Sequence, residues 1–147
     1  MHAELCNEYR NIPGLREMYG GSFIDQYDIY LVDNFPTKNP RKVILGAINL
    51  EKKKIGIRED LIGWYEHVYV DKTLKVDDKL VKVKGYVPVP LFEKTLYHEF
   101  RHALHPEEQS EEKIDDGALE DYLENYIRKN LSSYVNNAER KIREYVV

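Results

Sequence analysis

The spacing of hydrophobic residues divides the chain into two parts. Before Pro88, aromatic and β-branched residues gather in short runs separated by glycine, proline and charged residues, a pattern typical of strands and turns. After Pro90, hydrophobic residues recur every three or four positions, which is the period of an amphipathic helix. The pattern predicts an α+β fold in a single domain, residues 1–147, with most strands before the main helices.

The first part contains several strand-like segments. Their residue ranges are 27–32, 42–50, 54–58, 65–70 and 80–87. A short charged turn joins the second and third of these, which favours a β-hairpin. A polar stretch, 71–79, separates the last two strands. Two short helical segments are expected near the N-terminus, over residues 3–10 and 15–19.

The second part predicts helices. Residues 91–104 form the first, because Phe92, Leu96 and Phe100 recur at intervals of four. Pro106 should end this helix, since a residue before proline is biased away from helical geometry. The next helix is expected from Ser110, a good N-cap, to about residue 129, and a charged helix should follow over residues 131–147.

Composition narrows the possible functions. Hydrophobic residues make up 42% and charged residues 33%, a globular balance, and no apolar run approaches the ~20 residues that span a membrane. The net charge of −4 arises from 22 basic and 26 acidic residues mixed along the chain, which gives no basic field for nucleic acid. The first residues hold no apolar signal segment, and Cys6 is the only cysteine of the sequence. We therefore expect a cytoplasmic protein that binds neither nucleic acid nor membranes.

The segment His-Glu-Phe-Arg-His at residues 98–102 carries the clearest chemistry. Residues four apart share one face of a helix, so the imidazoles of His98 and His102 can bind the same metal ion. Glu99 lies beside them, where it can accept a proton from a metal-bound water. The hydrophobic stripe of the same helix lies roughly opposite the histidines. The sequence thus predicts one Zn²⁺ ion in a cleft on this helix.

A catalytic zinc usually takes three protein ligands and leaves a position for water, so a third ligand must lie outside the motif. His105 is one candidate, although Pro106 ends the helix there. The metzincin pattern asks for a glycine and a histidine where this chain has His105 and Glu108, and it does not fit. The remaining candidates are the following carboxylates: Glu111, Glu112, Asp115, Asp116, Glu120 and Glu124.

The motif and the chain length resemble those of the gluzincins, in particular the small single-domain minigluzincins. In those families a glutamate on the next helix completes the metal site, and residues 120–124 look like that segment. Leu123 stands where alanine is commoner, and Glu124 where aspartate is commoner. The resemblance covers residues 91–129 closely and the preceding strands only in general layout.

This resemblance implies a zincin-like fold, with a mixed twisted sheet, the motif helix and a following glutamate helix. It implies Zn²⁺ ligands at His98, His102 and Glu120, with Glu124 accepting a hydrogen bond from a ligand imidazole. It also implies that Glu99 is the catalytic base of peptide-bond hydrolysis.

The same resemblance implies that a peptide or protein substrate binds in extended form along a sheet edge. Residues 44–50 and 80–87 are both candidates for that edge strand. Small relatives can be latent, with a terminal segment across the cleft, so His2 and Cys6 are candidates for capping the metal. Two alternatives remain open: an inactive zincin-like binding or regulatory module, and an interaction protein in which the motif is accidental.

Overall fold

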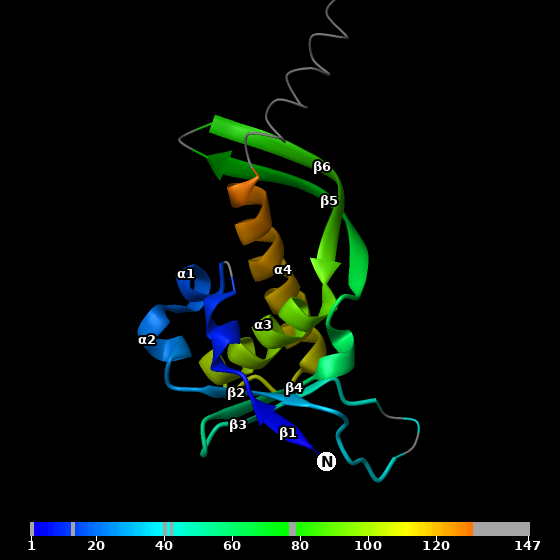
Figure 1. Cartoon of the computed structure of the whole chain (residues 1–147). Coiled ribbons are helices and arrows are strands. Elements are labelled where there is room, and N and C mark those ends of the chain that lie inside the picture. The colour runs from blue at the N-terminus through cyan, green and yellow to red at the C-terminus, as the bar shows by residue number, and fades with distance from the viewer. Residues whose placement is uncertain (1, 13, 40, 42, 77–78, 131–147) are drawn as a thin grey trace, which may run out of the picture.

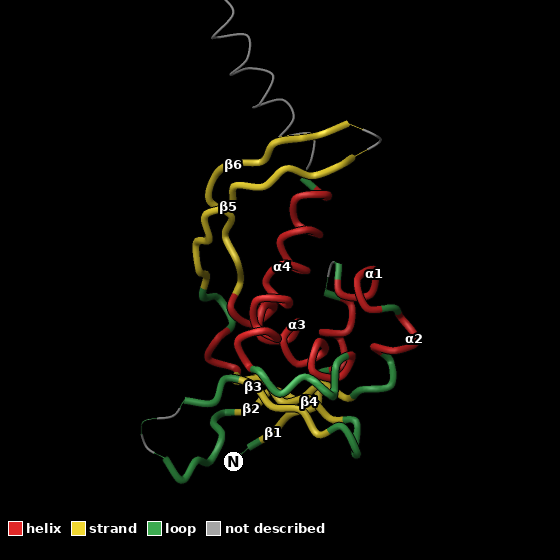
Figure 2. The backbone as a smooth tube through the Cα atoms, turned by 180° about the vertical axis from the view of Figure 1, so that it is seen from behind, coloured by secondary structure: helices red, strands yellow, loops and turns green. Residues whose placement is uncertain are grey.

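The computed structural model describes residues 2–12, 14–39, 41, 43–76 and 79–130. This part of the chain has the expected α+β character. A four-stranded sheet forms one layer, α3 (Leu91–Leu104) lies on one of its faces, and α4 (Glu111–Lys129) packs on α3 and rises away from the sheet (Figure 1). A long two-stranded hairpin rises beside the helices, and the view from behind shows the same arrangement (Figure 2).

The four-stranded sheet has the order β1-β2-β4-β3. Its strands are β1 (Ala3–Leu5), β2 (Asp28–Val32), β3 (Gly46–Asn49) and β4 (Lys54–Arg58). β2 and β4 are parallel, whereas the other two pairs are antiparallel, so the sheet is mixed. The predicted hairpin of β3 and β4 is confirmed, although β3 begins at Gly46. Within the described ranges, β3 lies at one edge of the sheet and pairs with β4 alone.

The helix predicted for residues 3–10 is wrong. Ala3–Leu5 is a strand that pairs with β2, and the 3₁₀ helix η1 (Asn7–Asn11) follows it. The Cys6 amide donates a hydrogen bond of 2.8 Å to the Ile29 carbonyl. Pairing with the open edge of β2 therefore overrides the weak local helical pattern. The predicted helix α1 (Leu15–Tyr19) is confirmed, and α2 (Gly21–Ile24) comes directly after it.

The two predicted strands near the middle of the chain are present but longer. β5 (Tyr65–Val76) and β6 (Lys79–Pro90) form one hairpin, so most of the polar stretch 71–79 is strand rather than loop. Alternate side chains face inward, with Val70, Val83 and Val87 each at most 2% exposed, while their neighbours point to solvent. The short helix η2 (Glu59–Leu61) links β4 to this hairpin.

The two long helices begin and end as predicted. α3 (Leu91–Leu104) buries Phe92, Leu96 and Phe100, and it ends before Pro106. α4 (Glu111–Lys129) begins after Ser110, whose hydroxyl accepts a hydrogen bond of 3.3 Å from the Lys113 amide. The helix predicted for residues 131–147 lies outside the described residues. None of the helices in the described part is long and apolar enough to cross a membrane.

α4 packs on α3 and crosses it, which sets the geometry of the site (Figure 1). Glu111, at the start of α4, lies beside His102 near the end of α3. Further along, the rings of Tyr97 and Tyr122 are 5.5 Å apart between their centres. The first turn of α4 is therefore held against the last turns of α3.

Candidate metal centre

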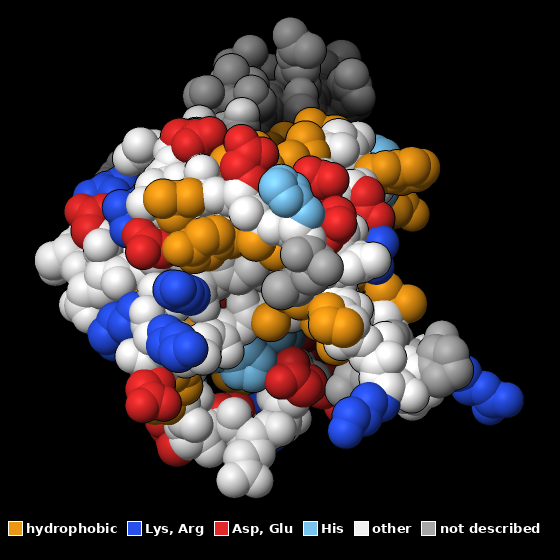
Figure 3. All heavy atoms as spheres, turned by 60° about the horizontal axis from the view of Figure 1, so that its bottom comes forward, with side chains coloured by type: hydrophobic (Ala, Val, Ile, Leu, Met, Phe, Trp, Pro, Cys, Tyr) orange, Lys and Arg blue, Asp and Glu red, His pale blue; other side chains and the backbone are white. Residues whose placement is uncertain are grey.

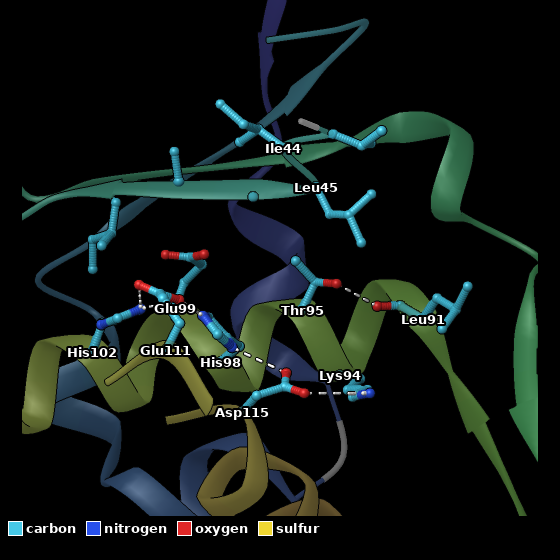
Figure 4. Close-up of a pocket in the computed structure, with 14 residues that line it drawn as sticks. Ile44, Leu45, Leu91, Lys94, Thr95, His98, Glu99, His102, Glu111 and Asp115 are labelled. Atoms are coloured by element: carbon cyan, nitrogen blue, oxygen red, sulfur yellow. Dashed lines mark hydrogen bonds and ion pairs between the residues drawn. The ribbon is translucent and has the colours of Figure 1, made fainter. Parts of the chain in front are cut away.

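A cleft of about 620 Å³ separates α3 from the edge strand β3. Residues 43–48 form one wall, α3 forms the other, and the start of α4 closes one side (Figure 4). On the face shown in Figure 3, histidine side chains lie in a recess beside acidic and hydrophobic side chains. The residues lining the cleft include His98, Glu99 and His102, as the motif predicted.

The two histidines converge on one carboxylate. The Nε2 atom of His98 lies 3.0 Å from Oε2 of Glu111. The Nε2 atom of His102 lies 3.2 Å from the same oxygen and 3.0 Å from Oε1. The two imidazole rings are 4.8 Å apart between their centres. Helical spacing thus places both ring nitrogens at one point, as expected for residues four apart.

These atoms fit a small divalent cation. One ligand atom from each of His98, His102 and Glu111 can be chosen so that all lie within 4.8 Å of one another. Tetrahedral zinc with bond lengths of about 2.0–2.2 Å separates neighbouring ligand atoms by about 3.3–3.6 Å, a little more than the nitrogen–oxygen distances of 3.0 and 3.2 Å. Two imidazoles and a carboxylate are a ligand set that zinc takes in catalytic sites.

Glu99 is the buried acid of the site. Its side chain is 5% exposed, and among the described residues it is the one charged residue that is buried. Its Oε1 atom lies against the backbone of Gly46 on β3, 3.2 Å from the position that a Cβ atom there would take. Burial, and to a lesser extent the charge of Glu111, raises the pKa of Glu99 to about 8. A bound dication beside it would lower that pKa.

Glu111 has the opposite electrostatic setting. Partial desolvation acts to raise the pKa of Glu111, but the hydrogen bond and charge of His102, together with those of His98, outweigh it. The pKa of Glu111 is therefore below its usual value. An ionised carboxylate is the form that binds a metal ion.

A series of charged side chains extends from the Nδ1 side of the His98 ring. Its Nδ1 atom lies 3.2 Å from Oδ1 of Asp115. The other Asp115 oxygen is 3.9 Å from the Lys94 ammonium, which also lies 3.2 Å from a Glu66 carboxylate oxygen. Figure 4 shows Asp115 between His98 and Lys94. Such a carboxylate fixes the orientation and tautomer of a metal-binding imidazole.

The structure does not bring Glu120 or Glu124 to the histidines. Glu120 lies 3.4 Å from the Lys72 ammonium, and Glu124 lies 2.9 Å from a nitrogen of Arg128. Both line a different cavity, of about 300 Å³, between α4 and the hairpin. Glu120 is nine positions after Glu111, about two and a half helical turns, and so points to the opposite side of α4.

A pattern in the sequence indicates that Glu111 and Asp115 face the histidines, and the family resemblance did not take account of it. Ala118 and Tyr122 are buried and form the side of α4 that packs on α3. Residues 111 and 115 continue the same stripe toward the N-terminus at a spacing of four, three and four. The acidic start of that stripe therefore faces the end of α3, where the histidines lie.

Three other sequence candidates lie apart from the cleft. The His105 side chain is 45% exposed and lies 3.7 Å from Glu107. Cys6 is buried where the chain leaves β1, and the His2 backbone amide bonds to Asp33. None of the three is among the described residues that line the cleft.

Comparisons with protein-family models, with curated proteins and with solved structures returned no match. The geometry of the site itself therefore carries the functional argument.

Proposed function

We propose that the chain is a zinc-dependent peptidase with a zincin-like active site. The convergence of His98 and His102 on the Glu111 carboxylate, in an open cleft with Glu99 beside them, carries this proposal. The order of sheet, edge strand, motif helix and following acidic helix agrees with the layout expected of that fold. In this proposal Glu111 takes the ligand role that the family resemblance assigned to Glu120.

The residues of the cleft divide the chemistry among them. When bound, zinc lowers the pKa of a water molecule to about 7 and polarises a carbonyl oxygen. Glu99 accepts the proton of the attacking water at its carboxylate and later passes it to the leaving amine. Its burial keeps bulk water away from this proton transfer. Asp115 holds His98 in place through Nδ1.

The edge strand β3 is the structural basis for a peptide substrate. Its inner edge pairs with β4, and residues 43–48 line the cleft directly above the motif. An extended peptide can add to the outer edge of β3 by backbone hydrogen bonds, which places its carbonyls over the histidines. Of the two strands that the sequence suggested for this role, β3 is the one that lines the cleft.

Metal content tests the ligand assignment. Purified protein loaded with zinc and then desalted should retain one equivalent, measured by inductively coupled plasma mass spectrometry. His98→Ala and Glu111→Gln should each lower the retained zinc strongly. Glu120→Gln is the matched control, because the same chemical change is made on the opposite side of the same helix. Full retention in Glu111→Gln, with loss in Glu120→Gln, would overturn the assignment of Glu111.

Cleavage of an unbiased peptide library, read by mass spectrometry, tests the reaction. Hydrolysis should disappear in Glu99→Gln while zinc remains bound, since Glu99 supplies proton transfer and not metal affinity. Bound zinc without cleavage of any library peptide would instead support an inactive binding or regulatory module. Absence of zinc binding in the wild-type protein, unchanged by His98→Ala, would support an accidental motif.

A further inference from the structure

Several exposed aromatic residues lie on or beside the outer face of the β5–β6 hairpin. Tyr69 and Tyr86 face each other across the two strands, with ring centres 5.3 Å apart, and they are 51% and 70% exposed. Tyr65 lies further down the same face, and Trp64, 67% exposed, comes just before it. We call these four residues the aromatic face. Large exposed aromatic residues are typical of binding surfaces.

The aromatic face continues from one end of the cleft. The Leu91 amide, at the start of α3, donates a hydrogen bond of 2.9 Å to the Trp64 carbonyl. Leu91 lines the cleft together with Leu45, which lies above Thr95 in Figure 4. A polypeptide that leaves the cleft past Leu91 therefore meets Trp64 and then the hairpin.

We propose that the aromatic face binds the C-terminal part of an extended polypeptide substrate whose scissile bond lies at His98 and His102. This inference rests on the proposed peptidase function. Leu45 lies above Thr95 on the side of Leu91, and Gly46, the first residue of β3, lies beside Thr95 and Glu99, so β3 runs in the same direction as α3 (Figure 4). A peptide that adds antiparallel to β3 therefore directs its C-terminal residues toward Leu91 and the hairpin.

Distances set the length of substrate that reaches the aromatic face. Seven helical residues separate Leu91 from His98, about 10 Å at 1.5 Å per residue. Four strand residues separate Pro90 from Tyr86, about 13 Å at 3.3 Å per residue. An extended chain needs about seven residues to cover the sum of these distances. Substrates with fewer residues after the scissile bond do not reach the Tyr69–Tyr86 pair.

Charge indicates the chemistry of the residues that follow. Beyond the tyrosine pair, Lys84 stands opposite Asp71, and Lys82 stands opposite Thr73, all on the outer face. Two lysines and one aspartate leave this end of the face positively charged. The matching segment carries aromatic or aliphatic residues about five to seven positions after the scissile bond, followed by an acidic residue.

The size of the aromatic face favours a peptide segment over a second copy of the chain. Four aromatic side chains, each only partly exposed, offer less than the ~800 Å² per partner that a stable protein interface buries. A single extended segment needs no more area than this. The oligomeric state therefore separates the two occupants.

Peptides built on a cleavage core found in the library test the proposal. The first peptide has two residues after the scissile bond. The second has ten residues there, all glycine or serine. The third also has ten residues there, with aromatic residues followed by glutamate. We expect kcat/KM to be about tenfold higher for the third peptide than for the first, mainly through KM. In the double variant Tyr69→Ser/Tyr86→Ser, this ratio should fall close to one. An equal ratio in wild type and variant would overturn the proposal.

Leu50→Ser is the matched control, since Leu50 is an exposed hydrophobic residue that directly follows the C-terminal end of β3. It should leave the tenfold ratio in place. A second variant, Lys82→Glu/Lys84→Glu, keeps all four aromatic residues. It should reverse the preference, so that lysine replaces glutamate in the better substrate, and an unchanged preference would contradict the charge argument. Circular dichroism checks that each variant is folded.

A binding assay separates failure of this inference from failure of the peptidase proposal. Zinc-loaded Glu99→Gln protein is used to select from a phage-displayed library of random 16-residue peptides. Enrichment of aromatic residues followed by acidic ones, lost in the Tyr69→Ser/Tyr86→Ser variant, supports docking even without any hydrolysis. Hydrolysis without such enrichment supports the peptidase and overturns the docking site. A dimer in light scattering that dissociates in the tyrosine variant would assign the face to a second copy.

Discussion

Asp115 holds His98 from the side opposite to the candidate metal, with 3.2 Å between the carboxylate oxygen Oδ1 and the ring nitrogen Nδ1. The two residues come from different helices and lie 17 positions apart in the sequence. Glu111 faces the other nitrogen of the same ring. His98 is therefore fixed at both nitrogens by acidic residues one turn apart on α4.

This relationship predicts the effect of Asp115→Asn. The amide keeps the size of the side chain but removes the negative charge that orients the imidazole of His98. We expect zinc affinity to fall about 10- to 100-fold, the range typical of such supporting residues. Competition with a chromophoric chelator measures this. Asp116→Asn, an exposed neighbour on the same helix, is the control, and an equal loss in both variants would contradict the role of Asp115.

Two buried tyrosines provide a matched pair for stability. The Tyr19 hydroxyl donates a hydrogen bond of 2.8 Å to Asp121, which also accepts one of 2.6 Å from Arg101. The Tyr97 hydroxyl is buried, and among the described residues it has no hydrogen-bond partner. Removing the first hydroxyl breaks a bond to a charged group, whereas removing the second relieves an unsatisfied one.

We therefore expect Tyr19→Phe to lower the free energy of unfolding by about 1.5–3 kcal/mol. Tyr97→Phe should leave it within about 0.5 kcal/mol of wild type, or raise it, because no bond is lost. Urea denaturation followed by circular dichroism compares the two, with m values checked for two-state unfolding. Equal destabilisation by both substitutions would contradict the hydrogen-bond assignment.

The histidines could be predicted from the sequence because their arrangement is local. A spacing of four on a helix fixes both rings on one face, and the hydrophobic stripe around Leu96 shows which face is buried. The starts and ends of α3 and α4 were predictable for the same reason, since Pro106 and Ser110 act within one turn. The burial of Glu99 was not, because it depends on the close approach of β3 at Gly46.

Which glutamate lies beside the two histidines depends on tertiary packing. Glu111 and Glu120 are equally plausible from residue type, and only the side of α4 that packs on α3 distinguishes them. The N-terminal strand β1 also depends on tertiary packing, because Ala3–Leu5 acquires its conformation by pairing with β2, which lies more than 20 residues later. Local propensity has no access to either relationship.

Gly46 sets the distance between β3 and α3. A Cβ atom at this position would lie 2.7 Å from Cγ2 of Thr95 and 3.2 Å from both Oε1 of Glu99 and Cδ1 of Ile57. Gly46→Ala must therefore move the strand or displace Thr95, and it also crowds Glu99, so we expect a loss of about 1–3 kcal/mol in the free energy of unfolding. Urea denaturation of the metal-free protein measures it.

Gly56→Ala on the adjacent strand is the control for this prediction. Its nearest contact would be 3.3 Å, to the edge of the Phe35 ring, so it should cost less than Gly46→Ala. A larger loss at Gly56 than at Gly46 would show that the contact between β3 and α3 is looser than the distances indicate.

Cys6 predicts a pH dependence that does not involve the metal. Burial, followed by the charges of Glu8 and Glu4, raises the pKa of the Cys6 thiol above its usual value. Because the thiolate is the reactive form, a raised pKa means less thiolate at any pH below it, and burial also blocks access.

Alkylation of Cys6 by iodoacetamide at pH 8 should therefore be much slower in the folded protein than in urea. The alkylation rate of the folded protein should also begin to rise at a higher pH than that of free cysteine. Mass spectrometry of the alkylated fraction over time measures both effects. Equal rates in the folded and unfolded protein would contradict the burial of Cys6 behind β1, and the Glu8→Gln variant should shift the pH profile back toward that of free cysteine.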